Sequence, residues 1–142
     1  IPQNTGSIGR LCLATQCRLH LVGPLGFEIT DSHLKRAGLD YWEHLDVVHH
    51  KSWDLFWESR EKDKDFVFLS KKAGHTLFQH PFKKGSYLIF GKETAGLSDS
   101  ILNRYPTQTF RIPILDARVR SLNLAQAVGI TVYEGLRQLD LS

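Results

Sequence analysis

Residues 120–133 read Arg-Ser-Leu-Asn-Leu-Ala-Gln-Ala-Val-Gly-Ile-Thr-Val-Tyr, and the rest of the chain is organised around them. The stretch begins with small and polar residues and then becomes apolar at helical spacing, which predicts a helix with a buried face. Asn123 is the expected N-cap, and Gln126 three positions later resembles a capping box. The free amides at such a helix start are suited to holding a polar edge of a ligand. On this stretch alone, a well-capped core helix is the simpler interpretation.

The predicted helix continues past this stretch and is apolar on more than one side. Its expected buried face contains Leu124, Ala127, Val128, Thr131, Gly135, Leu136 and Leu139. Ile130 and Tyr133 lie off that face, so we expect the helix to contact protein on two sides. The second contact comes either from another copy of the chain or from elements of the same fold.

The chain has 142 residues, enough for one domain with a substantial core and too few for two comfortable ones. Hydrophobic residues make up 42% and charged residues 23%, an ordinary globular balance without an apolar run that could span a bilayer. The net charge of +3 permits a polyanionic partner without demanding one. Cys12 and Cys17 are expected on different faces of a helix, so no disulfide is expected, which fits a reducing compartment.

Short apolar runs that end in polar or turn residues occur at 66–69, 87–90 and 110–112. Their alternation with helical patterns predicts a mostly parallel, buried sheet with helices on both faces, which is the α/β class. Further strands are expected over 18–22 and 45–48, and further helices near the N-terminus, over 31–37 and 52–60, and from Ser98 onward.

Ligands of parallel sheets bind at the carboxyl ends of the strands, so residues 70–74, 91–97 and 113–121 are expected around one site. The segment Gly-Lys-Glu-Thr-Ala-Gly-Leu at 91–97 has glycines at 91 and 96, which allow a tight turn and a close ligand. An ordinary strand-to-helix loop is the plainer interpretation. Neither a dinucleotide fingerprint nor a phosphate loop is present, because Gly-x-Gly-x-x-Gly and Gly-Lys-Ser/Thr do not occur.

Three ordered motifs resemble those of the SPOUT methyltransferases. They are Asn4-Thr5-Gly6 with Arg10, the 91–97 segment, and Arg-Ser-Leu-Asn-Leu at 120–124. Residues 36–41 and 111–113 also fit, so the resemblance covers nearly the whole chain. The chain is most similar to the small branch that methylates the ribose 2′-hydroxyl of the tRNA wobble nucleotide.

The resemblance implies a single domain over 1–142, a C-terminal deep trefoil knot, S-adenosylmethionine as the cofactor, tRNA as the substrate and a homodimer. Knots are very rare, so only the family match supports this one. The family's short first strand, which precedes Ile1, is absent, so we expect the natural N-terminus to lie upstream. We expect a cytoplasmic protein, or an organellar one if the missing part carried a transit peptide.

The resemblance also assigns site residues. The cofactor is expected against Leu69, Gly91, Glu93, Gly96, Ile112, Ser121, Leu122 and Asn123. Apolar walls and backbone hydrogen bonds are what an adenine ring needs. The 113–121 loop carries little recognisable pattern, so its contacts are left open.

Arg10 is the expected catalytic residue, with Asn4 and Tyr133 beside it. An arginine stays protonated, so we expect Arg10 to orient the ribose or phosphate and to stabilise developing alkoxide charge rather than to act as a base. Asn4 is expected to fix the turn. The plainer alternatives are a surface arginine at position 10 and a core tyrosine at 133.

Lys35, Arg36, Arg118 and Arg120 are the expected RNA contacts, with Lys71, Lys72, Lys83 and Lys84 as further cations; scattered surface lysines are the alternative. The seven histidines lack metal-site spacing, so no metal is expected. Two other functions remain open: methylation of ribosomal RNA, and a knotted module that binds RNA without catalysis.

Overall fold

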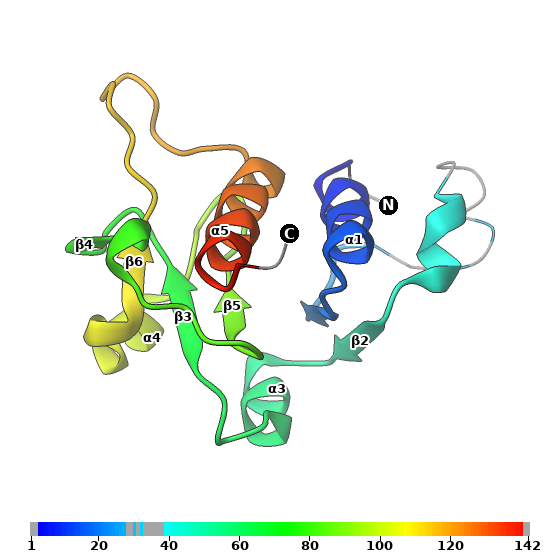
Figure 1. Ribbon diagram of the computed structural model, residues 1–142. Coiled ribbons are helices and arrows are strands. Elements are labelled where there is room, and N and C mark those ends of the chain that lie inside the picture. Colours follow the sequence, from blue (N-terminus) through cyan, green and yellow to red (C-terminus); the bar gives the residue numbers. More distant parts are fainter. Residues whose placement is uncertain (1–2, 28–29, 31, 33–38, 141–142) are drawn as a thin grey trace. The chain divides into compact units, whose positions relative to one another are not determined.

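The computed structural model of the chain describes residues 3–27, 30, 32 and 39–140. These residues form two compact units, Ile1–Glu61 and Lys62–Ser142, and each unit is described by itself. Figure 1 shows the helices and strands of both. The expected helix over 31–37 and the expected RNA contacts Lys35 and Arg36 lie outside the described residues. No helix in the described part is long and apolar enough to cross a membrane.

The first unit contains α1 (Gln3–Thr15), β1 (Leu19–Val22), the 3-10 helix η1 (Asp40–His44), β2 (Val47–His50) and α3 (Trp53–Ser59). β1 and β2 pair in parallel. The sequence predicts β1 to within one residue, whereas β2 begins two residues later than expected. Ser52 begins α3 as its N-cap, because its hydroxyl accepts a hydrogen bond from the Leu55 amide.

The close contact between α1 and η1 depends on glycine. An added Cβ at Gly9 would lie 2.5 Å from the Trp42 ring, and one at Gly6 would lie 3.4 Å from Leu39. Trp42 is buried in the core of this unit together with Cys12 and Leu19. The two glycines therefore let η1 approach the helix backbone directly.

Cys17 packs against the core cluster that contains Cys12, so the expectation that the two cysteines point to different faces is wrong. α1 ends at Thr15, and Gln16 adopts a left-handed φ of 57°. The Cys17 amide then donates to the Cys12 carbonyl at 2.8 Å, which is the Schellman pattern of a helix end. Both thiols are free, and burial raises the pKa of Cys12 to about 12.

The second unit contains a four-stranded parallel sheet in the order β4-β6-β3-β5. Its elements are β3 (Phe66–Leu69), β4 (His75–Thr76), the 3-10 helix η2 (Leu77–Gln79), β5 (Tyr87–Ile89), α4 (Asp99–Arg104), the 3-10 helix η3 (Pro106–Gln108), β6 (Thr109–Arg111) and α5 (Leu124–Gln138). The parallel α/β class is thereby confirmed. β4 has only two residues, too few for a periodic signal in the sequence.

Helices cover both faces of this sheet. Side chains alternate along β3, so neighbouring residues of this strand contact elements on opposite faces. Phe68 stacks on Tyr105, at the end of α4, with ring centroids 5.3 Å apart. Val67 points the other way, into a cluster with Leu77 and Phe82. Phe82 in turn lies 3.2 Å from the position of a Cβ on Gly135 of α5. α4 and α5 are therefore on opposite faces.

The last turn of α5 is joined to residues 80–82 by polar contacts. The Gln138 amide accepts from the Phe82 N–H and donates to the His80 carbonyl, both at 2.9 Å. It also donates to Glu134, a buried carboxylate that pairs with Arg137 at 2.7 Å. The side chain of Gln138 thus satisfies two backbone groups of residues 80–82, which lie outside the strands of the described sheet.

His80 is buried between Phe82 and Phe110. Its Nε2 atom lies 3.4 Å from the Asp65 carboxylate but makes no hydrogen bond among the described residues. Burial lowers the pKa of His80 below its ordinary 6.5, while Asp65 acts in the opposite direction and Lys83 adds to the lowering. As the pH falls, His80 therefore becomes protonated in the unfolded chain at a higher pH than in the folded protein.

We therefore expect the free energy of unfolding to fall as the pH drops from about 6.5 toward 5, by at most about 1.4 kcal/mol per pH unit from His80. His80→Gln should show a shallower slope than the unaltered protein in urea titrations at several pH values. His75→Gln, at an exposed histidine of the same unit, is the control and should keep the slope. Coincident slopes for His80→Gln and the unaltered protein would contradict the assignment.

Candidate active site

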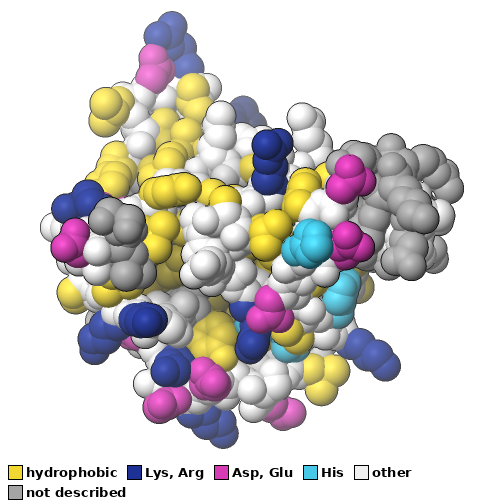
Figure 2. Space-filling model, turned by 45° about the vertical axis from the view of Figure 1, so that its right-hand side comes forward, with side chains coloured by type: hydrophobic (Ala, Val, Ile, Leu, Met, Phe, Trp, Pro, Cys, Tyr) yellow, Lys and Arg dark blue, Asp and Glu magenta, His cyan; other side chains and the backbone are white. Residues whose placement is uncertain are grey.

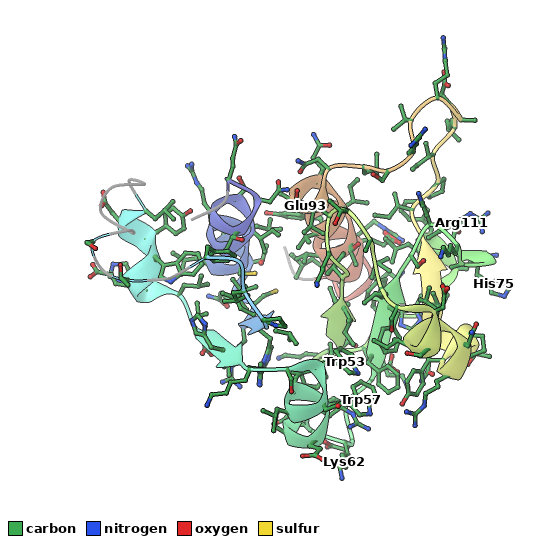
Figure 3. All side chains as sticks on the ribbon, turned by 180° about the vertical axis from the view of Figure 1, so that it is seen from behind. Trp53, Trp57, Lys62, His75, Glu93 and Arg111 are labelled. Atoms are coloured by element: carbon green, nitrogen blue, oxygen red, sulfur yellow. The ribbon has the colours of Figure 1, made fainter. Side chains whose placement is uncertain are left out.

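Three loops of the second unit begin at one edge of the sheet. Leu69, Gly91 and Ile112 lie at or just after the ends of β3, β5 and β6, and parallel strands end on the same side. In Figure 3, Glu93 and Arg111 both lie toward this edge. The structure therefore brings together the strand-end residues that the sequence analysis assigned to the cofactor.

The 91–97 loop closes tightly on itself. The Gly96 amide donates to the Lys92 carbonyl at 2.8 Å, and Gly96 has a φ of 67°. An added Cβ at Gly91 would lie 2.1 Å from the Gly96 carbonyl carbon and 2.3 Å from the Leu97 nitrogen. From the sequence, Gly91 was expected to leave space for a ligand. The backbone of the same loop occupies it instead, so Gly91 shapes the loop.

Ser121, Leu122 and Asn123 lead into α5. Asn123 is the N-cap, as predicted, and its side-chain oxygen accepts from the Gln126 amide at 3.2 Å. Figure 1 shows the N-terminal end of α5 on the side toward which the strand arrows of β3 and β5 point. The positive end of the helix dipole is therefore on the side of the strand-end loops.

The loop from β6 to α5 extends away from the sheet (Figure 1). Leu115 is 98% exposed, and Val119 is exposed as well. Arg118 pairs with Asp116 at 2.6 Å within this loop, and the pairing lowers the pKa of the Asp116 carboxyl. Both expected RNA contacts in this loop, Arg118 and Arg120, are exposed, and Arg118 is partly neutralised by its neighbour Asp116.

The expected catalytic residues come from two helices. Asn4 and Arg10 lie on α1 in the first unit, with Arg10 exposed and Asn4 half-buried. Tyr133 lies on α5 in the second unit and is 55% exposed, so its alternative interpretation as a core tyrosine is wrong. Ile130, one turn before it, is also exposed.

Two residues make long-range contacts that the sequence did not predict. The Tyr41 hydroxyl donates to the Gly6 carbonyl at 2.6 Å, and Arg111 donates to the Ala73 carbonyl at 3.1 Å, where it holds the loop after β3. Only the motif matches at 36–41 and 111–113 could have pointed to them. Neither contact follows from local periodicity.

Among the described residues, no group of three histidine, cysteine or acidic side chains could hold a metal ion. His50 instead lies 2.9 Å from His20, across the β1–β2 pair, and the two rings stack. Burial lowers the pKa of each imidazole. The face in Figure 2 mixes acidic and basic side chains with hydrophobic ones, so it is not one continuous basic surface.

The second unit has a parallel α/β fold, the class of fold in which ligands bind at the carboxyl ends of the strands. The model of the SpoU rRNA methylase family matches residues 1–133. The chain therefore belongs to the SpoU rRNA methylase family, and the resemblance to the SPOUT methyltransferases is confirmed.

Individual relatives match over nearly the whole chain. A tRNA (cytidine(34)-2'-O)-methyltransferase of Saccharophagus degradans is 47% identical over 146 residues, which is 100% of this chain and 92% of that protein. A solved structure that concerns the 2-OH methylation of C/U34 on tRNA is 44% identical with a TM-score of 0.89, covering 99% of this chain and 85% of its own. An AdoMet-bound rRNA methyltransferase from Sinorhizobium meliloti is 29% identical with a TM-score of 0.76, covering 98% of this chain and 52% of its own.

We expect Gly91→Ala to weaken binding of S-adenosylhomocysteine at least about tenfold, because even a methyl group displaces the 96–97 backbone. Calorimetric titration measures the affinity, and circular dichroism checks that the variant is folded. Gly26→Ala is the control, since it lies outside the expected site and an added Cβ there meets nothing within 4 Å. If folded Gly91→Ala binds as well as the control, the loop does not shape the cofactor site.

Proposed function

We propose that the protein transfers a methyl group from S-adenosylmethionine to the ribose 2′-hydroxyl of the wobble nucleotide, position 34, of tRNA. The observation that carries this proposal is the full-length similarity to a tRNA (cytidine(34)-2'-O)-methyltransferase. The strand-end loops of the second unit carry residues suited to holding this cofactor. As a tRNA enzyme, it would work in the cytoplasm.

The chain offers what this cofactor needs. When bound, S-adenosylmethionine supplies an electrophilic methyl group. Leu69 and Ile112 would provide apolar walls at the strand ends, and the closed 91–97 loop would bound the pocket. The start of α5, from Ser121 to its cap Asn123, would hold polar atoms of the cofactor. The protein's main task is to place the acceptor oxygen in line with the methyl group.

Arg10 would act on the acceptor. Its guanidinium remains protonated and therefore donates hydrogen bonds to a phosphate or to the 2′-oxygen as negative charge develops there. Asn4 would fix the helix start that carries Arg10. Tyr133 is exposed on α5 and available to a nucleotide or a second subunit.

We also propose that both units form one knotted domain and that two copies of the chain form a homodimer. Ile130 and Tyr133 are exposed one turn apart on α5, and Leu115 is almost fully exposed in the preceding loop. Apolar residues with this exposure stabilise a protein when a partner covers them. A two-fold pairing through α5 would cover the same surface on both copies.

The proposed substrate is tested by incubating the protein with labelled S-adenosylmethionine and either bulk tRNA or ribosomal RNA. We expect label in tRNA alone, and mapping of 2′-O-methylation should place it at nucleotide 34. Label confined to ribosomal RNA would contradict the proposed tRNA substrate and would make ribosomal RNA the substrate, in line with the family's description. Cofactor binding without any transfer would instead identify a non-catalytic RNA-binding module.

Arg10→Ala should reduce single-turnover methyl transfer by roughly 10²–10³-fold, because it removes donors that act on the developing charge. The affinity for S-adenosylhomocysteine should stay within about twofold, since the proposed contact is with the acceptor. Arg18→Ala is a suitable control, because Arg18 is an exposed arginine of the same unit in a surface ion pair with Asp46. Near-normal transfer by Arg10→Ala would remove Arg10 from the mechanism.

Ile130→Glu should convert the protein to a monomer, because it places a charge on the apolar face of α5. Sedimentation equilibrium at low micromolar concentration should give twice the chain mass of 16.2 kDa for the unaltered protein and about one chain for the variant. Gln126→Glu, at an exposed position of the same helix, should leave the mass unchanged. A mass near one chain for the unaltered protein would refute the dimer.

A further inference from the structure

Tyr41 joins η1 to the helix that carries Arg10. Its hydroxyl donates to the Gly6 carbonyl at 2.6 Å, across 35 positions of sequence. In an α-helix the carbonyl of residue 6 also accepts the backbone N–H of residue 10. The phenol of Tyr41 and the main chain of Arg10 therefore share one acceptor oxygen.

The surroundings leave Tyr41 little freedom. Gly6 is buried, and a Cβ there would lie 3.4 Å from Leu39 and 3.8 Å from the Tyr41 oxygen. Trp42, the next residue, is buried against Gly9 one turn further along α1. Burial raises the pKa of Tyr41, so the hydroxyl stays a proton donor at neutral pH.

Arg10 itself is poorly restrained by other groups. It is exposed, and among the residues that the structure describes it forms no ion pair. The Arg10 charge lowers the pKa of the Tyr41 phenol, against the larger effect of burial. A long side chain without a fixed partner loses rotamer entropy when it must adopt one geometry.

We propose that Tyr41 is a positioning residue for Arg10: its hydroxyl fixes the turn of α1 at Gly6, whose carbonyl also accepts the Arg10 amide, and so sets where the Arg10 side chain leaves the helix. The inference rests on the proposed function in assigning Arg10 to the acceptor ribose. In this role Tyr41 acts through Arg10 and not by contacting the substrate or the cofactor.

Tyr41→Phe removes the hydroxyl and keeps the ring. We expect the single-turnover rate on tRNA, at saturating cofactor, to fall about fivefold to tenfold. The affinities for S-adenosylhomocysteine and tRNA should stay within about twofold. In an Arg10→Ala background the same substitution should cause no further loss, because the residue it positions is gone. Tyr105→Phe removes a phenolic hydroxyl in the other unit and should keep the unaltered rate.

A second measurement needs no substrate. In ¹⁵N-arginine spectra of the free protein, the Nε–H signal of Arg10, assigned with Arg10→Ala, should shift and exchange faster with water in Tyr41→Phe. An unchanged signal would overturn the positioning role, even if methyl transfer to tRNA were absent and the proposed function had failed. Rate losses that add in the double variant would also overturn it, because they indicate a general structural effect.

Discussion

The parallel pairing of β3 with a neighbour on each side is the constraint on which the second unit depends. A parallel neighbour cannot be reached through a two-residue hairpin, so the chain crosses over between β3, β5 and β6 and places helices and turns in the crossovers. The three strands then end at the same edge. Loops that are distant in sequence therefore begin at the same edge, which is where ligands of parallel sheets usually bind.

The two faces of β3 pack against different elements. One face carries the stacked rings of Phe68 and Tyr105, whereas the other carries the aliphatic and aromatic cluster beneath α5. α5 also buries a carboxylate, Glu134. A buried charge is costly unless it is paired and hydrogen-bonded, and Arg137 and Gln138 meet that requirement. The polar contacts of Gln138 and the apolar core thus hold the helix to the same segment.

Glycine permits close backbone approach in both units, for two different reasons. In α1, Gly6 and Gly9 give room to side chains of η1 and so bring Tyr41 to the helix that bears Arg10. At Gly91 the neighbour is the main chain of the same loop, which tolerates no Cβ at all. Substitution at Gly91 should therefore disturb the fold of the loop itself, whereas at Gly6 it alters a packing contact between elements.

The sequence by itself determined the local elements: the strand runs near 66–69, 87–89 and 109–111, the Asn123 cap, and the motifs that indicate the family. These follow from patterns within a few residues, where periodicity and capping act. The tertiary structure alone decided the two-residue strand β4, the pairing of His20 with His50, the contact of Tyr41 with Gly6, and the backbone packed against Gly91. Each depends on register or close approach between segments that local sequence does not relate. The position of Cys17 was also not predictable from the pattern, because it depends on the residue at which α1 ends.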